Sequence, residues 1–331
     1  MGRGPSIPGF MRFSVIICTR NRPHQLQRAL RSIGQCVQPV DDRGWEVLVV
    51  DNGCAGLLEG IAHEFEPVLP LRVVREERVG LSNARNRGTL AAKGEWLLWT
   101  DDDVTVASHW LAEYCAAIGH FPNADVFGGP IRLHFEGKPP DWLVEGQNDV
   151  RSAYANRERH DVTQTFGGDG PLPYGANFAV RRSAALEFPF DPRLGHQPDH
   201  PTRGWEETFV IRKILRDRST GHWLPDAEVT HHIDAARQTS EYLRSYYFDT
   251  GFIHTFAETQ QMKRTRVADR LMRALFKAVR HEFAHAAQTL TGSRANRADH
   301  LRQAALNWGR AKAGLNMLVR ADHVPWSESG P

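Results

Sequence analysis

Several familiar binding motifs are absent from this sequence of 331 residues. Its four cysteines form no Cys-x-x-Cys pair and have no zinc-type spacing with histidine, which argues against a structural zinc site. There is no Gly-x-Gly-x-x-Gly run and no lysine loop of the Walker type, so a usual dinucleotide site and a P-loop are excluded. Unpaired cysteines favour a reducing, cytoplasmic compartment.

Long hydrophobic runs are absent as well. No apolar stretch approaches the ~20 residues that a membrane-spanning helix needs. No apolar signal-peptide region follows the start of the sequence. The first residues are rich in Gly and Pro, so we expect residues 1–12 to form a flexible lead.

Acidic residues are scarce near the C-terminal end. Between Lys263 and Arg320 there are thirteen Lys and Arg against three Asp and Glu, a net charge of +10. Because the whole chain has a formal net charge of +2, the remainder carries −8. An acidic main body argues against nucleic acid as its partner.

The main body alternates between short apolar runs and helical segments. Each apolar run stops at polar or turn-forming residues, as buried strands do. The alternation predicts an α/β fold with a mixed, mostly parallel sheet that helices flank on both faces. The expected strands are 13–18, 46–50, 71–74 and 94–100, and the expected helices are 24–35 and 82–94.

Polar side chains follow three of these strands at the point where each strand ends. They are Thr19–Arg22, Asp51–Asn52 and Asp101–Asp103. Ligands of such sheets bind outside the carboxyl ends of the strands, so the three sets should converge on one crevice. Three adjacent carboxylates repel one another unless a cation neutralises them, and oxygen ligands suit Mg²⁺ or Mn²⁺. A solvated acidic turn at Asp101–Asp103 is the alternative.

The second half of the main body is less regular. A strand is expected at 126–133, and residues 139–170 are expected to form a long loop of the kind that covers active sites. Residues 173–182 run through small side chains into another strand, which allows the backbone to approach a ligand closely.

Two acids and two histidines complete the candidate site. Glu206 and Glu207 open a predicted helix, where the helix dipole favours acids, so capping alone would also explain them. Residues 225–232 predict a strand that ends in His231 and His232.

Taken in order, these motifs resemble those of the family 2 glycosyltransferases, which have the Rossmann-like, nucleotide-binding GT-A fold. The resemblance covers residues 13–251, and the order of the whole set is more specific than any single motif. It implies a metal-dependent, inverting glycosyltransferase that moves a sugar from a nucleoside-diphosphate sugar, with UDP-sugars favoured, to a glycan or lipid-linked acceptor. The matching motifs are Thr19–Arg22, Val49–Gly53, Gly80–Asn86, Asp101–Asp103, Gly175–Asn177, Trp205–Glu207 and Pro225–His231.

The resemblance also implies roles for individual residues. Asp51 would hydrogen-bond the nucleotide base, and Arg85 would suit a diphosphate because its guanidinium makes paired, charge-assisted bonds. Mn²⁺ or Mg²⁺ would be held by Asp103 directly, together with Asp101 and His231. The implied nucleotide-sugar set is Thr19, Arg20, Asn21, Arg22, Asp51, Asn52, Arg85, Asp101 and Asp102, and the implied acceptor or sugar pocket is Gly175, Ala176, Asn177 and Trp205.

Glu207 is implied to be the catalytic base, which takes the proton of the acceptor hydroxyl as that oxygen attacks the anomeric carbon. The family usually has Asp here, and the longer Glu moves the carboxylate by about one C–C bond, so Glu206 stays open as the base. His232 is likewise the alternative to His231 as a metal ligand. Two further interpretations of the chain are a nucleotidyltransferase and a non-catalytic sugar-nucleotide-binding protein.

The C-terminal segment predicts two basic amphipathic helices, from about residue 263 and over 295–319. Such helices suit anionic membrane surfaces, so we expect peripheral association with the inner face of the cytoplasmic membrane. A hairpin packed on the catalytic domain, with a solvated basic face, is the alternative. The predicted domains are therefore a lead (1–12), a GT-A domain (13–260) and a basic helical extension (261–331). The apolar series of the first helix is Val267, Leu271, Leu275, Val279 and Phe283.

Overall fold

The computed structural model describes residues 11–37, 44–54, 56, 58–144, 148–158, 165–167, 171–198, 204–217, 220–259, 262–291 and 294–319. Most of the predicted lead, the end of the predicted extension and parts of the predicted loop at 139–170 therefore lie outside the described residues. Contacts divide the chain into two compact units. The first unit holds the described residues of 1–134, 154–201 and 205–233, and the second holds those of 135–153, 202–204 and 234–331.

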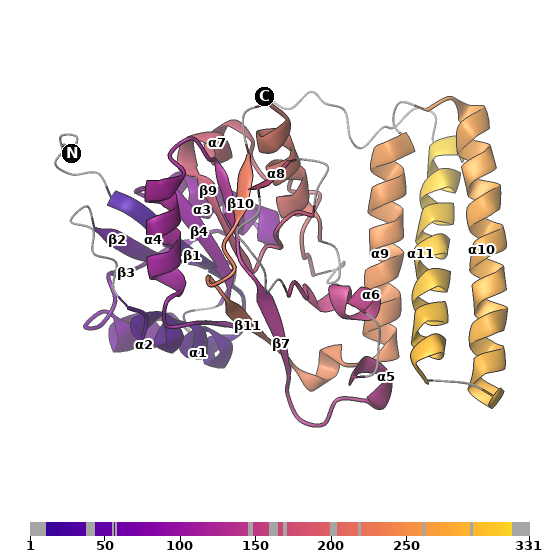
Figure 1. Cartoon of the computed structure of the whole chain (residues 1–331), viewed down its shortest axis with the longest axis horizontal. Coiled ribbons are helices and arrows are strands. Elements are labelled where there is room, and N and C mark those ends of the chain that lie inside the picture. The colour runs from indigo at the N-terminus through magenta and orange to yellow at the C-terminus, as the bar shows by residue number, and fades with distance from the viewer. Residues whose placement is uncertain are drawn as a thin grey trace. The chain divides into compact units, whose positions relative to one another are not determined.

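The first unit is built on a sheet that has eight strands in its described part, in the order β3-β2-β1-β4-β9-β6-β10-β8 (Figure 1). The strands β1 to β4 pair in parallel, whereas β9 runs antiparallel between β4 and β6. The predicted mixed, mostly parallel sheet is thus confirmed. Its strands are β1 (Met11–Thr19), β2 (Trp45–Asp51), β3 (Leu71–Arg75), β4 (Gly94–Asp101), β6 (Val126–Gly128), β8 (Thr165–Phe166), β9 (Asn177–Arg181) and β10 (Gly221–Trp223).

Helices cover both faces of this sheet because its central strands are apolar on both sides. Along β1, Val15 and Ile17 point to one face, where α1, α2 and α4 pack, and Ile16 points to the other, where α3, α7 and α8 pack. The helices are α1 (Pro23–Gly34), α2 (Leu58–Phe65), α3 (Leu81–Ala91), α4 (Trp110–His120), α7 (Arg182–Glu187) and α8 (Glu206–Asp217).

A smaller sheet joins three strands in the order β5-β11-β7. They are β5 (Val104–Val106), β11 (Val229–Ile233) and β7 (Ile131–Phe135). Strand β11 is antiparallel to β5 and pairs His231 with Val104, the residue that directly follows the Asp triplet. The sequence-based strand at 126–133 is in fact two strands, β6 and β7, because Pro130 between them has no amide hydrogen for a ladder.

The three predicted polar strand ends lie side by side at one edge of the large sheet. Thr19 pairs with Asp51 across β1 and β2, and Cys18 pairs with Asp101 across β1 and β4. The strand order reverses here, since β1 connects to β2 on one side and has β4 on the other. Such a switch point is where sheets of this type bind ligands.

The second unit consists mainly of three long helices (Figure 1). Helix α11 (Arg294–Val319) runs between α9 (Ser240–Thr259) and α10 (Arg264–Thr291) and contacts both. Gly251 and Gly309 make the contact of α9 with α11 close, because a Cβ at either position would collide with a backbone carbonyl of the other helix. Short helices α5 (Asp141–Val144) and α6 (Asn148–Arg151) also contact α11.

This division differs from the sequence-based boundary between residues 260 and 261. Helix α9 falls on the helical side because it packs along α11, and the described residues of 135–153 join it. Within the described residues, no helix has both the length and the apolar content to cross a membrane.

Candidate active site

Arg85 of α3 is the buried centre of the site. Its side chain is 2% exposed, and its Nη1 lies 3.0 Å from Oε1 of Glu206 and 4.0 Å from Oε2 of Glu207. Its Nη2 lies 3.7 Å from Oδ1 of Asp101. The guanidinium therefore connects the end of β4 to the start of α8 as a counter-charge for three carboxylates.

Aromatic rings hold this cation from the apolar side of the sheet. The guanidinium carbon of Arg85 lies 5.6–5.9 Å from the ring centroids of Trp99, Phe178 and Phe190. Ring faces attract cations, so this wall compensates in part for the lost hydration of the charge. The arrangement fixes Arg85 in one position.

Gly175 provides the space that Arg85 occupies. A Cβ at this position would collide with the guanidinium group. The small residues before β9 were predicted to let the backbone approach a ligand, and in the structure the Arg85 side chain approaches Gly175.

The two adjacent glutamates have different surroundings although both are buried. Glu206 makes the shorter contact with Arg85, whereas Oε1 of Glu207 accepts a hydrogen bond from the Gly175 amide at 3.3 Å. Burial and the neighbouring charge of Glu206 raise the pKa of Glu207 to about 7. A carboxylate that titrates near neutrality is suited to accept a proton.

The backbone is strained directly before these acids. Trp205 has a φ of +76°, a left-handed conformation that a bulky side chain rarely adopts. Such strain concentrates at functional sites, where the surrounding structure holds it. The residue was predicted to line the acceptor or sugar pocket.

Asp102 and Asp103 form a second group with the loop after β1. Nη1 of Arg22 lies 3.1 Å from Oδ1 of Asp102 and 3.2 Å from Oδ2 of Asp103. Thr19 donates its hydroxyl to Oδ2 of Asp102 at 2.8 Å. Burial raises the pKa of Asp102 to about 7, against the attraction of Arg22. Asp102 thus contacts the loop that the resemblance assigns to the nucleotide sugar.

His231 faces the last residue of the triplet. Its Nδ1 lies 2.8 Å from the backbone carbonyl of Tyr154, which can only accept, so this nitrogen carries a proton. In the neutral ring, Nε2 then presents a lone pair, and it lies 3.3 Å from Oδ1 of Asp103. Two electron-rich atoms at this separation suit a cation between them.

These ligands do not form a complete metal cage by themselves. Among the described residues, no group of three or more His, Cys, Asp or Glu side chains is arranged to hold a metal ion. Asp101, predicted as the third ligand, has Arg85 at 3.7 Å instead. His232 points elsewhere, since its Nε2 lies 2.9 Å from the hydroxyl of Thr105. Asp103 and His231 are the pair that the structure brings together.

The predicted nucleotide residues at the end of β2, Asp51 and Asn52, lie beside the loop after β1. Oδ1 of Asp51 accepts hydrogen bonds from the amides of Gly53 and Cys54 at 3.0 and 2.7 Å. The side chain of Asn52 holds the segment before α3, because it donates to the carbonyls of Glu76 and Arg78 and accepts from the Gly80 amide. Asn52 therefore shapes the site from within the protein.

The loop after β1 is tied to this segment through the backbone. The Asn52 amide donates to the Thr19 carbonyl at 3.0 Å, and the Asn21 amide donates to the Cys54 sulfur at 3.2 Å. Arg20 and Arg22 extend from this loop, and Asn21 adopts the left-handed conformation at a φ of +56°. The structure thus brings the predicted residues Thr19–Arg22 next to Asp51 and Asn52.

Asn177, a predicted pocket residue, makes four hydrogen bonds within the protein through its side chain. Its Oδ1 accepts from Trp110 and Tyr114, and its Nδ2 donates to the carbonyls of Pro130 and Ala227, all at 2.8–2.9 Å. Its neighbour Ala176 is also buried. Asn177 therefore connects α4, β9 and the start of both β7 and β11, and it presents no group to a sugar.

One contact of the candidate site had no signal in the sequence. The carbonyl of Tyr154 orients His231, and any residue type provides a backbone carbonyl, so no pattern could identify this position. Tyr114 and Trp110 were missed for a related reason, since each looks like an ordinary apolar position of a helix.

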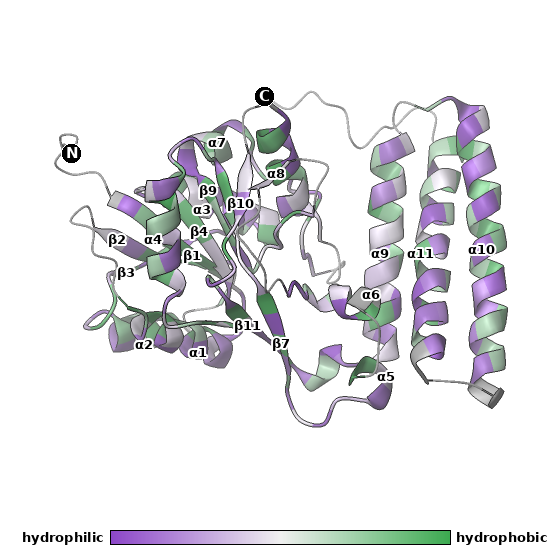
Figure 2. Cartoon of the chain, viewed as in Figure 1, coloured by the Kyte–Doolittle hydropathy of each residue, from purple (hydrophilic) through white to green (hydrophobic). Residues whose placement is uncertain are grey.

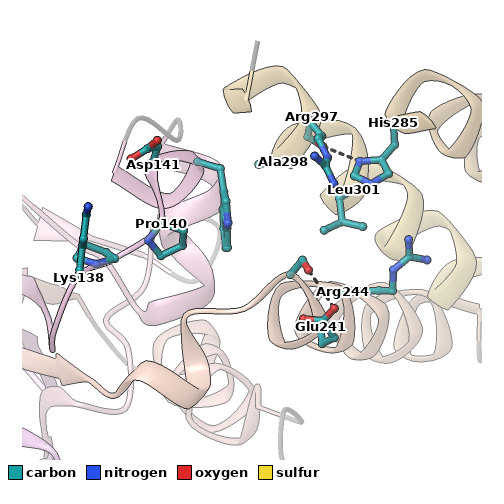
Figure 3. A pocket seen from close by; sticks show the side chains of 12 residues that line it. Lys138, Pro140, Asp141, Glu241, Arg244, His285, Arg297, Ala298 and Leu301 are labelled. Carbon is teal, nitrogen blue, oxygen red and sulfur yellow. Dashed lines mark hydrogen bonds between the residues drawn. The ribbon is translucent and has the colours of Figure 1, made fainter. Parts of the chain in front are cut away.

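The helical unit has a cavity of its own, of about 660 Å³. Figure 3 shows Lys138, Pro140 and Asp141 on one side of it and Arg297 and Leu301 on the other. None of its lining residues belongs to the predicted site. It mixes cationic, acidic and apolar groups.

Comparison with known sequences identifies relatives. The family model described as "Glycosyl transferase family 2" matches residues 14–188. The succinoglycan biosynthesis protein ExoM of Rhizobium meliloti (strain 1021) is 28% identical over 243 residues, 72% of each chain. A glucosyl-dolichyl phosphate glucuronosyltransferase of Haloferax volcanii is 22% identical and covers 72% of this chain and 75% of its own.

Solved structures share the fold. S. aureus TarS 1-349 in complex with UDP-GlcNAc matches with a TM-score of 0.54 at 17% identity, over 92% of this chain and 89% of that one. GalNAc-T7 with UDP, GalNAc and Mn²⁺ matches with a TM-score of 0.53 at 18% identity, over 96% and 58%. The predicted GT-A architecture is confirmed by these likenesses.

Proposed function

Because the chain belongs to glycosyl transferase family 2 and is a nucleotide-sugar-dependent glycosyltransferase, we propose that it inverts the anomeric carbon and depends on a divalent metal ion. The observation that carries the proposal is the asymmetry of Glu206 and Glu207, which share one buried arginine unequally. The Glu206 carboxylate is held by its ion pair with Arg85, and the Glu207 carboxylate is suited to take a proton.

Glu207 is the proposed base. As the acceptor oxygen attacks the anomeric carbon, its proton passes to Glu207, and the bond to the diphosphate oxygen breaks on the opposite face of the sugar. The raised pKa and the hydrogen bond from Gly175 support this role, because they describe a fixed carboxylate that can hold a proton near neutral pH. A single displacement of this kind inverts the configuration.

Glu206 is proposed as a positioning residue. Its short contact fixes Arg85, and Arg85 in turn neutralises part of the charge around Glu207 and Asp101. This interpretation favours Glu207 over Glu206 as the base.

Asp103 and His231 are proposed to hold Mn²⁺ or Mg²⁺. Ions of this type are often bound by one or two protein ligands together with substrate phosphates, so two protein ligands fit. The bound ion would neutralise the charge of the departing nucleoside diphosphate. Asp101 leaves the proposed ligand set because it faces Arg85.

The donor is proposed to lie against the three strand ends. Thr19, Arg22 and Asp102 form one network there, and Asp51 lies beside it. We propose a UDP-sugar, as the TarS and GalNAc-T7 structures contain UDP or UDP-GlcNAc. Arg20 and Asn21 belong to the same loop and are also proposed to contact the donor.

The acceptor is proposed to be a glycan or a lipid-linked sugar. The names of the two relatives point to succinoglycan synthesis and to a dolichyl phosphate-linked glucose. Trp205 and Gly175 lie next to the proposed base and are the residues proposed for this side of the site. The proposed location is cytoplasmic, at the inner face of the membrane.

A panel of nucleotide sugars tests the function. Purified protein is incubated with UDP-, GDP- and dTDP-sugars, and the released nucleoside diphosphate is measured with Mn²⁺ and with EDTA. We expect release from a UDP-sugar at a rate at least tenfold higher with Mn²⁺. Release that EDTA does not change would contradict metal dependence, and retention of configuration in the product would contradict inversion.

A further inference from the structure

Helix α10 presents four large apolar side chains to solvent. Met272, Phe276, Val279 and Phe283, here called the α10 stripe, are 65%, 69%, 43% and 73% exposed. Their spacing of three or four residues places them on one face of the helix. Figure 2 shows hydrophobic and hydrophilic residues alternating along α10. Clustered exposed apolar residues on a helix mark an interaction surface.

The other face of α10 is already occupied. Val267, Ala274 and Ala278 are buried, and α10 packs along α11. The sequence-based series for this helix contained Val267, which is in the core, and omitted Met272 and Phe276, which are exposed. The structure therefore redefines which residues a partner would meet.

Positive charge accompanies the α10 stripe. Arg266, Arg273, Lys277 and Arg280 are exposed, and at 100° per residue they project along one flank of the stripe. The two acids of the helix are engaged: Asp269 pairs with Arg273, and Glu282 pairs with Arg244 of α9. Counted over Arg264–Thr291, six Arg and Lys stand against these two acids.

The positive charge beside the α10 stripe favours an anionic lipid surface over a second copy of the chain as the binding partner. An antiparallel pairing with a second copy of the chain would bring the two cationic flanks together, and such like-charge contact is unfavourable. An anionic lipid surface neutralises the flank and takes up the apolar side chains at the boundary of head groups and acyl chains.

We propose that the α10 stripe and its basic flank dock on an anionic lipid bilayer. The helix lies in the plane of the surface, with Phe276 and Phe283 entering the interface and Lys277 and Arg280 contacting lipid phosphates. The inference deepens the proposed membrane location and does not depend on sugar transfer, so its failure would leave the proposed reaction intact.

Vesicle flotation with the full chain tests the proposal. Binding is compared for phosphatidylcholine vesicles and for vesicles with about 30% phosphatidylglycerol, at low and high salt. We expect at least tenfold stronger partitioning onto the anionic vesicles, which salt weakens. Equal partitioning onto both vesicle types would overturn the proposal.

Two double variants locate the surface. Lys277→Glu with Arg280→Glu should weaken anionic binding at least 25-fold, since each charge near the surface contributes about fivefold. Phe276→Ser with Phe283→Ser should weaken it at least tenfold. Lys312→Glu on α11 and Val68→Ser in the first unit, both at exposed positions, are the matched controls and should bind like wild type.

Folding and self-association are monitored in the same samples. All of the changed residues are exposed, so unchanged thermal unfolding is expected. Wild-type binding by both double variants would overturn the proposal. So would a dimer, detected by light scattering without lipid, that Phe276→Ser with Phe283→Ser dissolves, because the face would then bind a second copy.

Discussion

At the scale of single residues, the site depends on how one buried arginine is shared. Arg85 lies closest to Glu206, and Glu207 receives a backbone hydrogen bond in place of a close ion pair. Two chemically identical side chains, adjacent in sequence, thus have different contacts, although burial raises the pKa of both. The sequence could place both at the start of a helix, and only their contacts separate them.

The buried charge of Glu207 should destabilise the folded state at high pH. Its pKa rises from the ordinary glutamate value of 4.5 to about 7 in the fold, so the folded state holds the proton more tightly. The cost is absent below about pH 4.5, grows as the pH rises and is complete above about pH 7. Glu207→Gln removes it. We expect the variant to gain about 1–3 kcal/mol more unfolding free energy at pH 8 than at pH 5, in urea titrations. A gain that does not change with pH would contradict the raised pKa.

The opposite result is expected for its neighbour. Glu206→Gln leaves the buried Arg85 without its closest counter-charge, and breaking a buried pair costs about 3 kcal/mol or more. Urea denaturation at pH 8 measures this loss. Unchanged stability would show that Glu206 does not fix the arginine.

His231 and His232 provide a matched pair for the metal site. His231→Ala should raise the Mn²⁺ concentration needed for half-maximal transfer at least tenfold, because it removes one of two proposed ligands. His232→Ala should change it less than twofold, since that ring contacts Thr105. Equal effects of both changes would argue against His231 as a ligand.

At the scale of elements, the predictable parts are those with strong local patterns. The strands β1 to β4 and the helices α1 and α3 are periodic and end at clear turn residues, so their positions were confirmed within a few residues. Helices α2, α4 and α9 were missed. Helix α9 packs through Gly251 and mixes Tyr, Thr and Gly with apolar residues, so only its contact with α11 explains its place.

The candidate site likewise has features that the sequence could predict and features that it could not. The convergence of three strand ends followed from fold topology alone, and the register of β1 with β2 and β4 bears it out. The role of Asn177 could not follow, because its partners Trp110 and Tyr114 come from a helix more than sixty residues away in sequence. A side chain that connects distant elements gives no local signal.

Asn177 is therefore expected to act on stability. Asn177→Ala removes four buried hydrogen bonds between elements, which should cost about 2–4 kcal/mol of unfolding free energy. The KM for the donor should change less than twofold in the fraction that stays folded. A large rise in KM with unchanged stability would restore Asn177 to the sugar pocket.

At the scale of the whole molecule, the chain combines two units of different composition. The first carries the family 2 motifs on a mixed sheet, and the second holds three long helices, of which α10 and α11 lie in the basic part of the sequence. The charge difference between the main body and the C-terminal segment was visible in the sequence. The inclusion of α9 and residues 135–153 in the helical unit was not, because it depends on packing against α11.

We propose that Glu207 accepts the proton of the acceptor hydroxyl. The direct measurement compares kcat and donor Kd for wild type and Glu207→Gln with the nucleotide sugar and Mn²⁺ that the panel identifies. We expect a fall in kcat of about 10²–10⁴-fold, with the donor Kd unchanged within threefold, because the amide preserves the shape of the side chain and cannot take a proton. Turnover that stays within tenfold of wild type would contradict it.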